Sequence, residues 1–245
     1  MKFAVKTDIG QKRERNEDSY NIIVNDTKAP VSFIIADGMG GHNSGEIASR
    51  LAVDFVSNYI TSNPDEFSVE SEISEKISDL IAEANDLIIE NAKKNEKNSG
   101  MGTTIIVAMV LNNKIYISNV GDSRAYLIRN DRIEQITVDH SYIEELLKSG
   151  SITKEEAVNH PQKNIITRAL GSLEELKADT FSVELQKKDS ILFCTDGLTN
   201  MLNDDEILKV ITESKEPEEA CQKLIEGSIA NGGEDNITVI IIREF

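Results

Sequence analysis

The chain has 245 residues, of which 39% are hydrophobic and 28% charged, and 26 basic against 43 acidic residues give a formal net charge of −17 at pH 7. A chain of this length buries enough surface to fold as one large domain without disulfides or a structural metal. The negative charge repels phosphate backbones and anionic lipid, so we expect no nucleic acid and no membrane among the partners.

No segment of the sequence indicates export or membrane insertion. The N-terminal stretch MKFAVKTDIGQKRER has only three consecutive apolar residues, and no stretch approaches the roughly 20 apolar residues of a membrane span. Cys194 lies in an apolar run and Cys221 in a helical pattern, which is typical of reduced packing residues. The sequence therefore predicts a cytoplasmic protein.

The first predicted strands each meet an acidic residue. Glu17 and Asp18 stand just before the apolar segment SYNIIV, and the buried run FIIA ends in Asp37-Gly38. Asp-Gly alone most often makes a hairpin turn. Here apolar residues recur at helical spacing over residues 47–60, so a helix follows and not a return strand. We therefore interpret Asp37 as a carboxylate held at the end of a strand that leads into a helix.

A second amphipathic helix is predicted over residues 69–97, and a block of strands comes after it. The strands are TTIIVAMVL, KIYISNV, AYLIR and RIEQITV. Two-residue turns at Asn112-Asn113 and Asn130-Asp131 suit antiparallel pairing, because asparagine tolerates the left-handed backbone conformation.

The C-terminal part of the chain again mixes helices with strands. Two short helices open with capping boxes, Ser141 with Glu144 and Thr153 with Glu156. The elements after them, in chain order, are a strand near residues 180–185, the strand ILFCT, a helix capped by Asn203 with Glu206, a helix from Pro217 and the strand NITVIIIRE. Pairs of helices between runs of strands predict the α+β class, with helices packed outside antiparallel sheets.

Further acidic residues stand at strand boundaries, as Asp37 does. Asp196 ends the run ILFCT, Asp122 follows KIYISNV, and Asp235 precedes NITVIIIRE. If these loops converge, two carboxylates ~5 Å apart repel by about 3 kcal/mol, and divalent cations would remove that repulsion. Oxygen ligands without cysteine or histidine favour Mg²⁺ or Mn²⁺. The pattern predicts a metal centre, while each acid taken alone is more often a cap or a solvated charge.

Seven motifs spread over nearly the whole chain resemble, in order, those of the metal-dependent type 2C serine/threonine protein phosphatases. They are RERNEDSY, FIIADGMGGH, GMGTT, VGDSRAYLIR, ITRALG, LFCTDGLTN and DNITVIII, and they are most similar to the compact bacterial branch. The resemblance implies a four-layer αββα sandwich, in which pairs of α-helices flank two antiparallel β-sheets. It also implies a single catalytic domain over residues 1–245, with a variable flap at about residues 141–171.

The resemblance implies a centre of two Mn²⁺ or Mg²⁺ ions at one edge of the sandwich. Asp37 would bridge the two ions. The Gly38 carbonyl and Glu17, directly or through water, would bind one ion, and Asp196 and Asp235 the other.

Four more residues match positions of the family's active site. Asp18 would orient metal-bound water, Asp122 would help hold a weaker third ion, and Arg13 would bind the phosphate through its guanidinium fork. His42 would be the general acid for the leaving oxygen, with a structural role as its alternative, because Met39 stands where many eukaryotic members have a histidine.

One residue near this centre departs from the family's pattern, and three others are interpreted as structural. Asn200 stands where some relatives place an aspartate for the third ion. His140, His160 and Arg168 are interpreted as shaping the flap and not as taking part in the chemistry.

The resemblance implies a protein phosphatase that hydrolyses phosphoserine and phosphothreonine through a hydroxide bridging the metals. Its partners would be phosphoproteins, namely a bacterial serine/threonine kinase and the targets of that kinase, and we expect a monomer. A phosphatase-like binding module without turnover and a two-metal nuclease are the alternatives. The charge of −17 disfavours the nuclease. A cysteine phosphatase is excluded, because six positions after the two cysteines stand Asn200 and Gly227 where arginine is needed.

Overall fold

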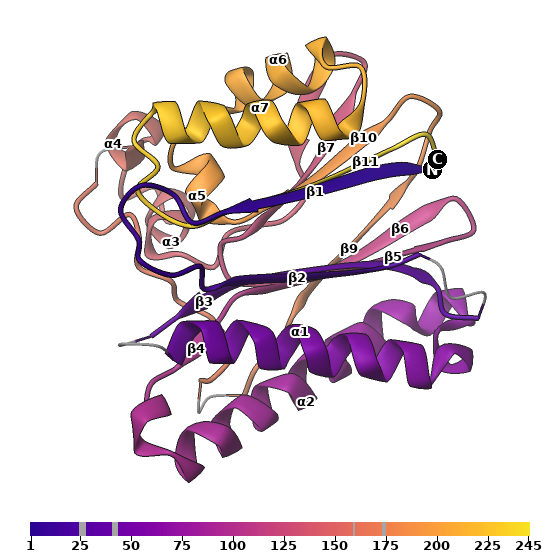
Figure 1. Ribbon diagram of the computed structural model, residues 1–245, viewed down its shortest axis with the longest axis vertical. Coiled ribbons are helices and arrows are strands. Elements are labelled where there is room, and N and C mark those ends of the chain that lie inside the picture. Colours follow the sequence, from indigo (N-terminus) through magenta and orange to yellow (C-terminus); the bar gives the residue numbers. More distant parts are fainter. Residues whose placement is uncertain (25–27, 41–43, 159, 173–174) are drawn as a thin grey trace.

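Two antiparallel sheets lie face to face, and each carries helices on its outer side (Figure 1). The computed structural model describes residues 1–24, 28–40, 44–158, 160–172 and 175–245. Because the sheets and helices form four layers, the predicted αββα sandwich of the α+β class is confirmed.

The strands of each sheet come from distant parts of the chain. The first sheet contains, in spatial order, β1 (Lys2–Asp8), β11 (Ile237–Arg243), β10 (Ser190–Cys194), β7 (Arg124–Arg129) and β8 (Arg132–Gln135). The second contains β2 (Asp18–Ile23), β3 (Val31–Met39), β5 (Ile105–Leu111), β6 (Lys114–Val120) and β9 (Asp179–Glu184), and the short β4 (Gly102–Thr103) pairs with the end of β3.

The helices divide between the two outer faces and one end of the sandwich. Helices α1 (Ser44–Ser62) and α2 (Ile73–Lys94) cover the second sheet, and α6 (Asp204–Glu213) and α7 (Pro217–Ala230) cover the first (Figure 1). The short helices are α3 (Tyr142–Lys148), α4 (Lys154–Val158) and α5 (Asp196–Thr199), with 3₁₀ turns at Pro64–Phe67, Glu70–Glu72 and Glu96–Asn98. Within the described ranges, no helix has the length and apolar character that a bilayer crossing requires.

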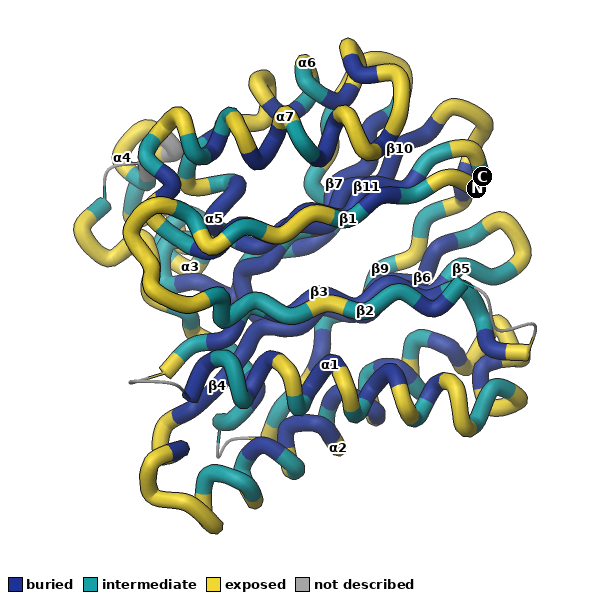
Figure 2. The backbone as a smooth tube through the Cα atoms, viewed as in Figure 1, coloured by how far each residue is buried: buried dark blue, intermediate teal, exposed yellow. Residues whose placement is uncertain are grey.

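Three apolar cores hold the layers together, and they explain why several strands are apolar without interruption. On β3, Phe33 and Ile35 pack between the sheets, while Ile34 and Ala36 pack under the helices. Side chains alternate across a strand, so a strand buried on both faces needs apolar residues at every position. Figure 2 shows these central strands buried and the outer surfaces of the helices exposed.

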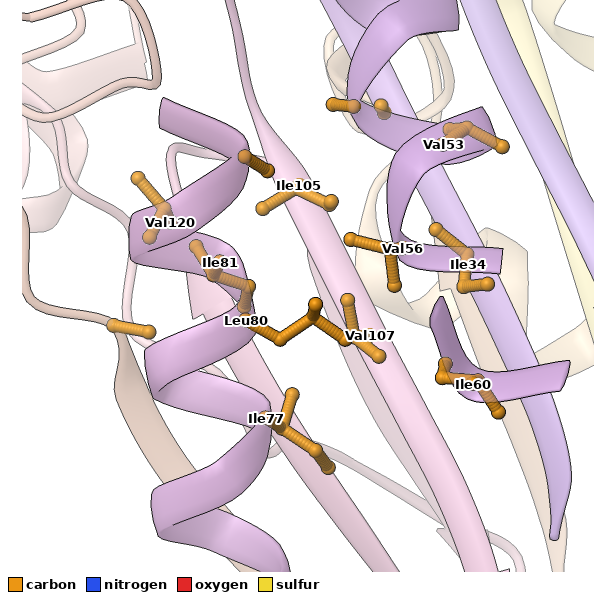
Figure 3. Packing of buried hydrophobic residues seen from close by; sticks show 14 of the residues in the cluster. Ile34, Val53, Val56, Ile60, Ile77, Leu80, Ile81, Ile105, Val107 and Val120 are labelled. Atoms are coloured by element: carbon orange, nitrogen blue, oxygen red, sulfur yellow. The ribbon is translucent and has the colours of Figure 1, made fainter. Parts of the chain in front are cut away.

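The core under α1 is closely packed, which allows a test of its contribution. Ile34 on β3 is fully buried and lies beside Val56 and Ile60 of α1 (Figure 3). Replacing Ile34 by valine removes one methylene group and is expected to lower the free energy of unfolding by about 1 kcal/mol. Urea denaturation measures this change. The exposed Val69, replaced by alanine, serves as the control and should change stability by less than about 0.5 kcal/mol.

Both predicted hairpin turns are confirmed. Asn112 and Asn113 have φ of 51° and 63°, and Asn130 and Asp131 have φ of 52° and 54°. Positive φ at both central residues gives the turn whose twist matches that of the paired strands.

Three elements differ from the sequence prediction. Strand β1 was not predicted, because its lysines and alternating exposure hide an edge strand that pairs with β11 along its full length. Strand β3 does not end at Asp37 but continues to Met39, because β4 pairs with its last two residues. The helix predicted over residues 69–97 is divided, with 3₁₀ turns on both sides of α2.

Candidate metal centre

The acidic residues from the strand boundaries gather at one end of the sandwich. Asp37 follows Ile35 by two positions and therefore faces the space between the sheets. Asp18 is its direct partner in the β2–β3 ladder. Directly opposite residues on one face have Cβ atoms about 5 Å apart, so the chain brings these two carboxylates together by strand pairing. This end of the sandwich holds α5 and lies opposite the chain termini (Figure 1).

Asp18 also ties the two sheets to each other. Its Oδ2 accepts hydrogen bonds from the hydroxyls of Thr238, on β11, at 2.6 Å and of Thr195, directly after β10, at 3.0 Å. Thr195 is followed by Asp196, whose negative charge acts on the carboxyl group of Asp37 and, after burial, helps to raise its pKa. The cluster is therefore built from both sheets, and neither sheet alone could form it.

Burial and mutual repulsion act on the protonation of these acids. Removal from water, and next the neighbouring carboxylates, raise the pKa of Asp122 to about 8, of Asp18 to about 7 and of Asp196 to about 6. The same causes raise the pKa of Asp37 well above its usual value. Without added positive charge, these groups hold protons near neutral pH that ordinary aspartates release below pH 5.

Several carboxylate oxygens of the cluster are buried without a hydrogen-bond partner in the described part of the chain. They are Glu17 Oε1, Asp18 Oδ1, Asp122 Oδ1 and Asp196 Oδ1. A buried polar atom left without a partner costs about 1–3 kcal/mol. A ligand that satisfies four such oxygens is a hard cation, and the donor set suits Mg²⁺ or Mn²⁺. The residues present therefore fit a divalent metal centre.

Asp235 and Asp196, like Asp18, are engaged by other side chains. Arg13 Nη2 lies 2.6 Å from Asp235 Oδ2, and Asn200 Nδ2 donates to Asp196 Oδ2 at 2.9 Å. As the side chains stand, no three histidine, cysteine or carboxylate groups of the described ranges are arranged to hold one ion. As far as the structure describes the chain, Asp196 still has its Oδ1 free to bind a metal, whereas Asp235 Oδ2 would have to exchange Arg13 for the ion.

Gly38 is a glycine because three segments meet at its α-carbon. A Cβ atom there would stand 2.1 Å from the carbonyl oxygen of Gly45 and 2.6 Å from that of Glu17. The Gly38 amide donates to the Glu17 carbonyl at 3.1 Å. The close approach brings the start of α1 and the segment before β2 against the end of β3, beside Asp37.

The structure also contains positioning residues to which sequence reasoning gave no role. The buried Asn236 accepts from the Glu17 amide at 2.7 Å and donates to the carbonyls of Ile9 at 2.9 Å and Arg15 at 2.8 Å. It therefore holds the segment that carries Arg13 and Glu17 against the start of β11. Its position directly after Asp235 was the only sequence signal.

The predicted His42 lies outside the described residues, so its position relative to the cluster is not part of this structure. Asn200, which departs from the acidic residue of some relatives, hydrogen-bonds Asp196. Asp122 and Asp196 line a cavity of about 560 Å³ between the predicted flap and α5–α6. A larger groove, of about 900 Å³, lies between α2 and the segment before β9 and contains none of the predicted site residues.

Known proteins are similar to this chain over nearly its whole length. The family model described as Protein phosphatase 2C matches residues 9–226. The serine/threonine phosphatase stp of Listeria innocua is 41% identical over 243 residues, which cover 99% of this chain and 96% of the relative.

Solved structures are similar as well. The structure of the S. agalactiae serine/threonine phosphatase has a TM-score of 0.93 at 37% identity and covers 99% of both chains. The catalytic domain of the serine threonine protein phosphatase PstP in complex with two manganese ions has a TM-score of 0.84 at 31% identity, with 98% of this chain and 96% of that chain covered.

Proposed function

Because this chain belongs to the protein phosphatase 2C family, we propose that it is a metal-dependent enzyme that hydrolyses phosphoserine and phosphothreonine monoesters in proteins. The observation that carries the proposal is the cluster of carboxylates from both sheets whose buried oxygens have no partner in the described part of the chain. A phosphatase-like module without turnover has no need of such a costly cluster.

The proposed ligands divide between two ions. Asp37 contributes to both, the Gly38 carbonyl and Glu17 to one, and Asp196 and Asp235 to the other. Bound Mn²⁺ or Mg²⁺ supplies a nucleophilic water at neutral pH and neutralises charge on the phosphate. The oxygen donors suit either ion, and the manganese complex of PstP supports the assignment.

Three further residues have proposed roles around these ligands. The threonine hydroxyls fix one oxygen of Asp18, so its buried Oδ1 is left to accept a hydrogen bond from the attacking water. Asp122, beside Asp196 in the cavity under the flap, is proposed to hold a weaker third ion. His42 is kept as the proposed general acid on its motif alone.

Arg13 is proposed to bind the phosphate group of the substrate. Its side chain is half exposed and contacts Asp235, one of the proposed ligands, and this contact supports a phosphate-binding role for its guanidinium fork. Arg13→Ala is expected to raise KM for p-nitrophenyl phosphate by roughly tenfold, because a hydrogen bond to a charged group contributes about 1.5–3 kcal/mol before losses to solvent. Steady-state kinetics measure this change.

Arg15→Ala is the matched control for Arg13. Arg15 is also exposed, and its nearest carboxylate is Glu46 at 3.9 Å, away from Asp235. Its removal is expected to leave KM unchanged. An equal rise of KM in both variants would mean that Arg13 acts only through general surface charge.

We propose that residues 1–245 form one catalytic domain that works as a cytoplasmic monomer in signalling, opposite a serine/threonine kinase that phosphorylates the same proteins. The net charge of −17 supports the absence of nucleic acid and anionic membranes from its partners. The exposed large apolar side chains of the described residues are scattered over separate elements: Met1, Ile9, Tyr20, Val69 and Ile165. Scattered apolar residues do not form an oligomer interface. A light-scattering mass of two chains would contradict the monomer.

The enzymatic proposal is tested by hydrolysis of p-nitrophenyl phosphate and of a phosphothreonine peptide with Mn²⁺ and with EDTA. Metal-dependent release of phosphate from both is the expected result. Metal-dependent cleavage of DNA without phosphatase activity would favour the nuclease instead. The absence of any metal-dependent turnover would favour the binding module.

A further inference from the structure

The turn that carries Asp122 is held by a side chain outside the proposed metal centre. Gly121 precedes Asp122 and has φ of 109°, a conformation that side-chain-bearing residues rarely adopt. Both polar groups of its backbone are bound by His140. The Gly121 amide donates to His140 Nδ1 at 3.0 Å, and the His140 amide donates to the Gly121 carbonyl at 2.9 Å.

The same histidine is fixed from its other side. His140 Nε2 lies 3.2 Å from Asp179 Oδ2 and 3.1 Å from Arg168 Nη1, and Arg168 Nη1 donates to Asp179 Oδ1 at 2.8 Å. Because Nδ1 accepts from a backbone amide, the ring proton belongs on Nε2, where it is donated to Asp179. Asp179 thereby sets the orientation of the ring, and Arg168 holds Asp179 while also contacting Nε2.

His140 stands at the root of the flap. Its carbonyl accepts from the Thr167 amide at 2.8 Å, and the adjacent residues Ser141 and Ile166 form a β-bridge. The chain between them leaves and returns at this point. His140 is buried, with 7% of its surface exposed, so these contacts are protected from water. One residue therefore links the flap root to the turn before Asp122.

The turn that contains Gly121 also supports the backbone of Asp37. Ser123 and Thr104 share a hydroxyl hydrogen bond of 2.8 Å. Thr104 accepts from the Asp37 amide with its hydroxyl at 2.9 Å and donates its own amide to the Asp37 carbonyl at 2.8 Å. A Cβ on Gly121 would meet the Thr104 methyl group at 2.5 Å, so the turn and Thr104 are in direct contact.

We propose that His140 is a positioning residue of the phosphatase reaction, which places Asp122 and buttresses Asp37 by clamping the Gly121 turn to the flap root. The proposal rests on the proposed function for its kinetic consequences. Partners that orient metal ligands typically change activity or metal affinity by about 10- to 100-fold when they are removed.

Two substitutions separate the two ends of the imidazole. His140→Asn keeps an acceptor close to the position of Nδ1, and His140→Gln moves the polar group toward Nε2 and leaves Gly121 without its acceptor. We expect His140→Gln to lower kcat for p-nitrophenyl phosphate by at least about tenfold with KM within about threefold of wild type, and His140→Asn to retain most of kcat. This small substrate makes no contacts that depend on a peptide.

Hydrogen exchange of the Gly121 amide, followed by NMR in the metal-free protein, is the second measurement. His140→Gln is expected to accelerate this exchange by about tenfold, and His140→Asn to leave it near the wild-type rate. If the wild-type protein proves to have no metal-dependent activity, the proposed function fails. The exchange comparison then still decides whether His140 clamps the turn.

Arg129→Lys is the control for loss of stability alone. Arg129 pairs with Asp189 at 2.7 Å, as Arg168 pairs with Asp179, but it does not contact the Gly121 turn. It should lower Tm without changing kcat. If His140→Gln does not fold, Asp179→Ala removes the acceptor of the Nε2 proton while keeping Nδ1, and its kcat should fall below that of Arg129→Lys.

The proposal is overturned if His140→Gln has wild-type kcat and wild-type exchange at Gly121. It is also overturned if the Asn and Gln variants lose kcat equally while Gly121 stays protected, because His140 would then serve packing only. Wild-type kcat in Asp179→Ala, where that variant replaces an unfolded His140→Gln, has the same meaning.

Discussion

Asp37→Asn is expected to lower kcat/KM for p-nitrophenyl phosphate and for a phosphothreonine peptide by about a thousandfold or more, which corresponds to roughly 4 kcal/mol of transition-state stabilisation. Asp37 faces Asp18 across the β2–β3 ladder and feels the charge of Asp196, so it is the acid through which the contributions of both sheets meet. An amide of the same shape keeps the packing but removes the charge that a bridging ligand needs.

The same variant should be more stable, and not less, in EDTA. Burial and four neighbouring aspartates make an ionised Asp37 costly, so a neutral amide relieves repulsion in the metal-free protein. Loss of activity together with a higher Tm in EDTA therefore excludes misfolding as the cause. Asp54→Asn, on the exposed side of α1, is the control and should change neither quantity. Activity within tenfold of wild type would remove Asp37 from the proposed ligand set.

The stability of the metal-free protein is expected to fall as pH rises from about 4 to about 8. An aspartate whose pKa is raised in the folded state binds more protons there than in the unfolded chain. The stability that it contributes is fully present below the unfolded pKa, near 3.8, and is lost through the folded pKa of about 6 for Asp196, about 7 for Asp18 and about 8 for Asp122. Each such group lowers the free energy of unfolding by up to about 1.4 kcal/mol per pH unit within its window.

Groups with a lowered pKa act in the opposite direction over part of this range, and among the described residues His140 is the one that does so nearest neutral pH. Burial lowers the pKa of His140, so protonation of the unfolded chain below about pH 6.5 favours unfolding there. Asp122→Asn separates the two effects, because it removes a titration that extends to about pH 8 and leaves His140 in place. Between pH 6.5 and 8, its stability should fall less steeply than that of wild type.

Mn²⁺ should reverse the loss of stability that the metal-free protein shows as pH rises. Metal ions bind the deprotonated ligands, so their stabilisation grows as pH rises, and a concentration of 100 times the dissociation constant adds about 2.7 kcal/mol. Urea denaturation at several pH values, with EDTA and with Mn²⁺, measures both curves. Two coincident curves would mean that the acidic cluster binds no metal.

The positions of individual carboxylates beside strands could be read from the sequence, for a local reason. Asp37 and Asp196 each end an uninterrupted apolar run, and a strand buried on both faces must be apolar until it leaves the core. Which side chains lie next to these carboxylates could not be predicted in the same way. The pairing of Asp18 with Asp37 depends on the register of two strands, and its bonds to Thr195 and Thr238 cross from one sheet to the other.

The elements that the sequence did not reveal are those defined by distant partners. Strand β1 exists because β11, from the far end of the chain, supplies its hydrogen bonds. Asn236 and His140 have their importance only through backbone groups that folding brings to them. The role of a buried amide or imidazole depends on its hydrogen-bond partners, and residue type and spacing do not reveal those partners.

The anchoring of Asp18 by Thr195 and Thr238 has a consequence for the activity of the chain while it is being translated. The N-terminal acids are synthesised early, yet their partners belong to β10 and β11, which are among the segments made latest. A nascent chain that lacks residues 235–238 has neither Asp235 nor the second threonine anchor. Translation products that lack this segment should therefore be catalytically silent, and a growing polypeptide cannot dephosphorylate its surroundings before residues 235–238 have been synthesised.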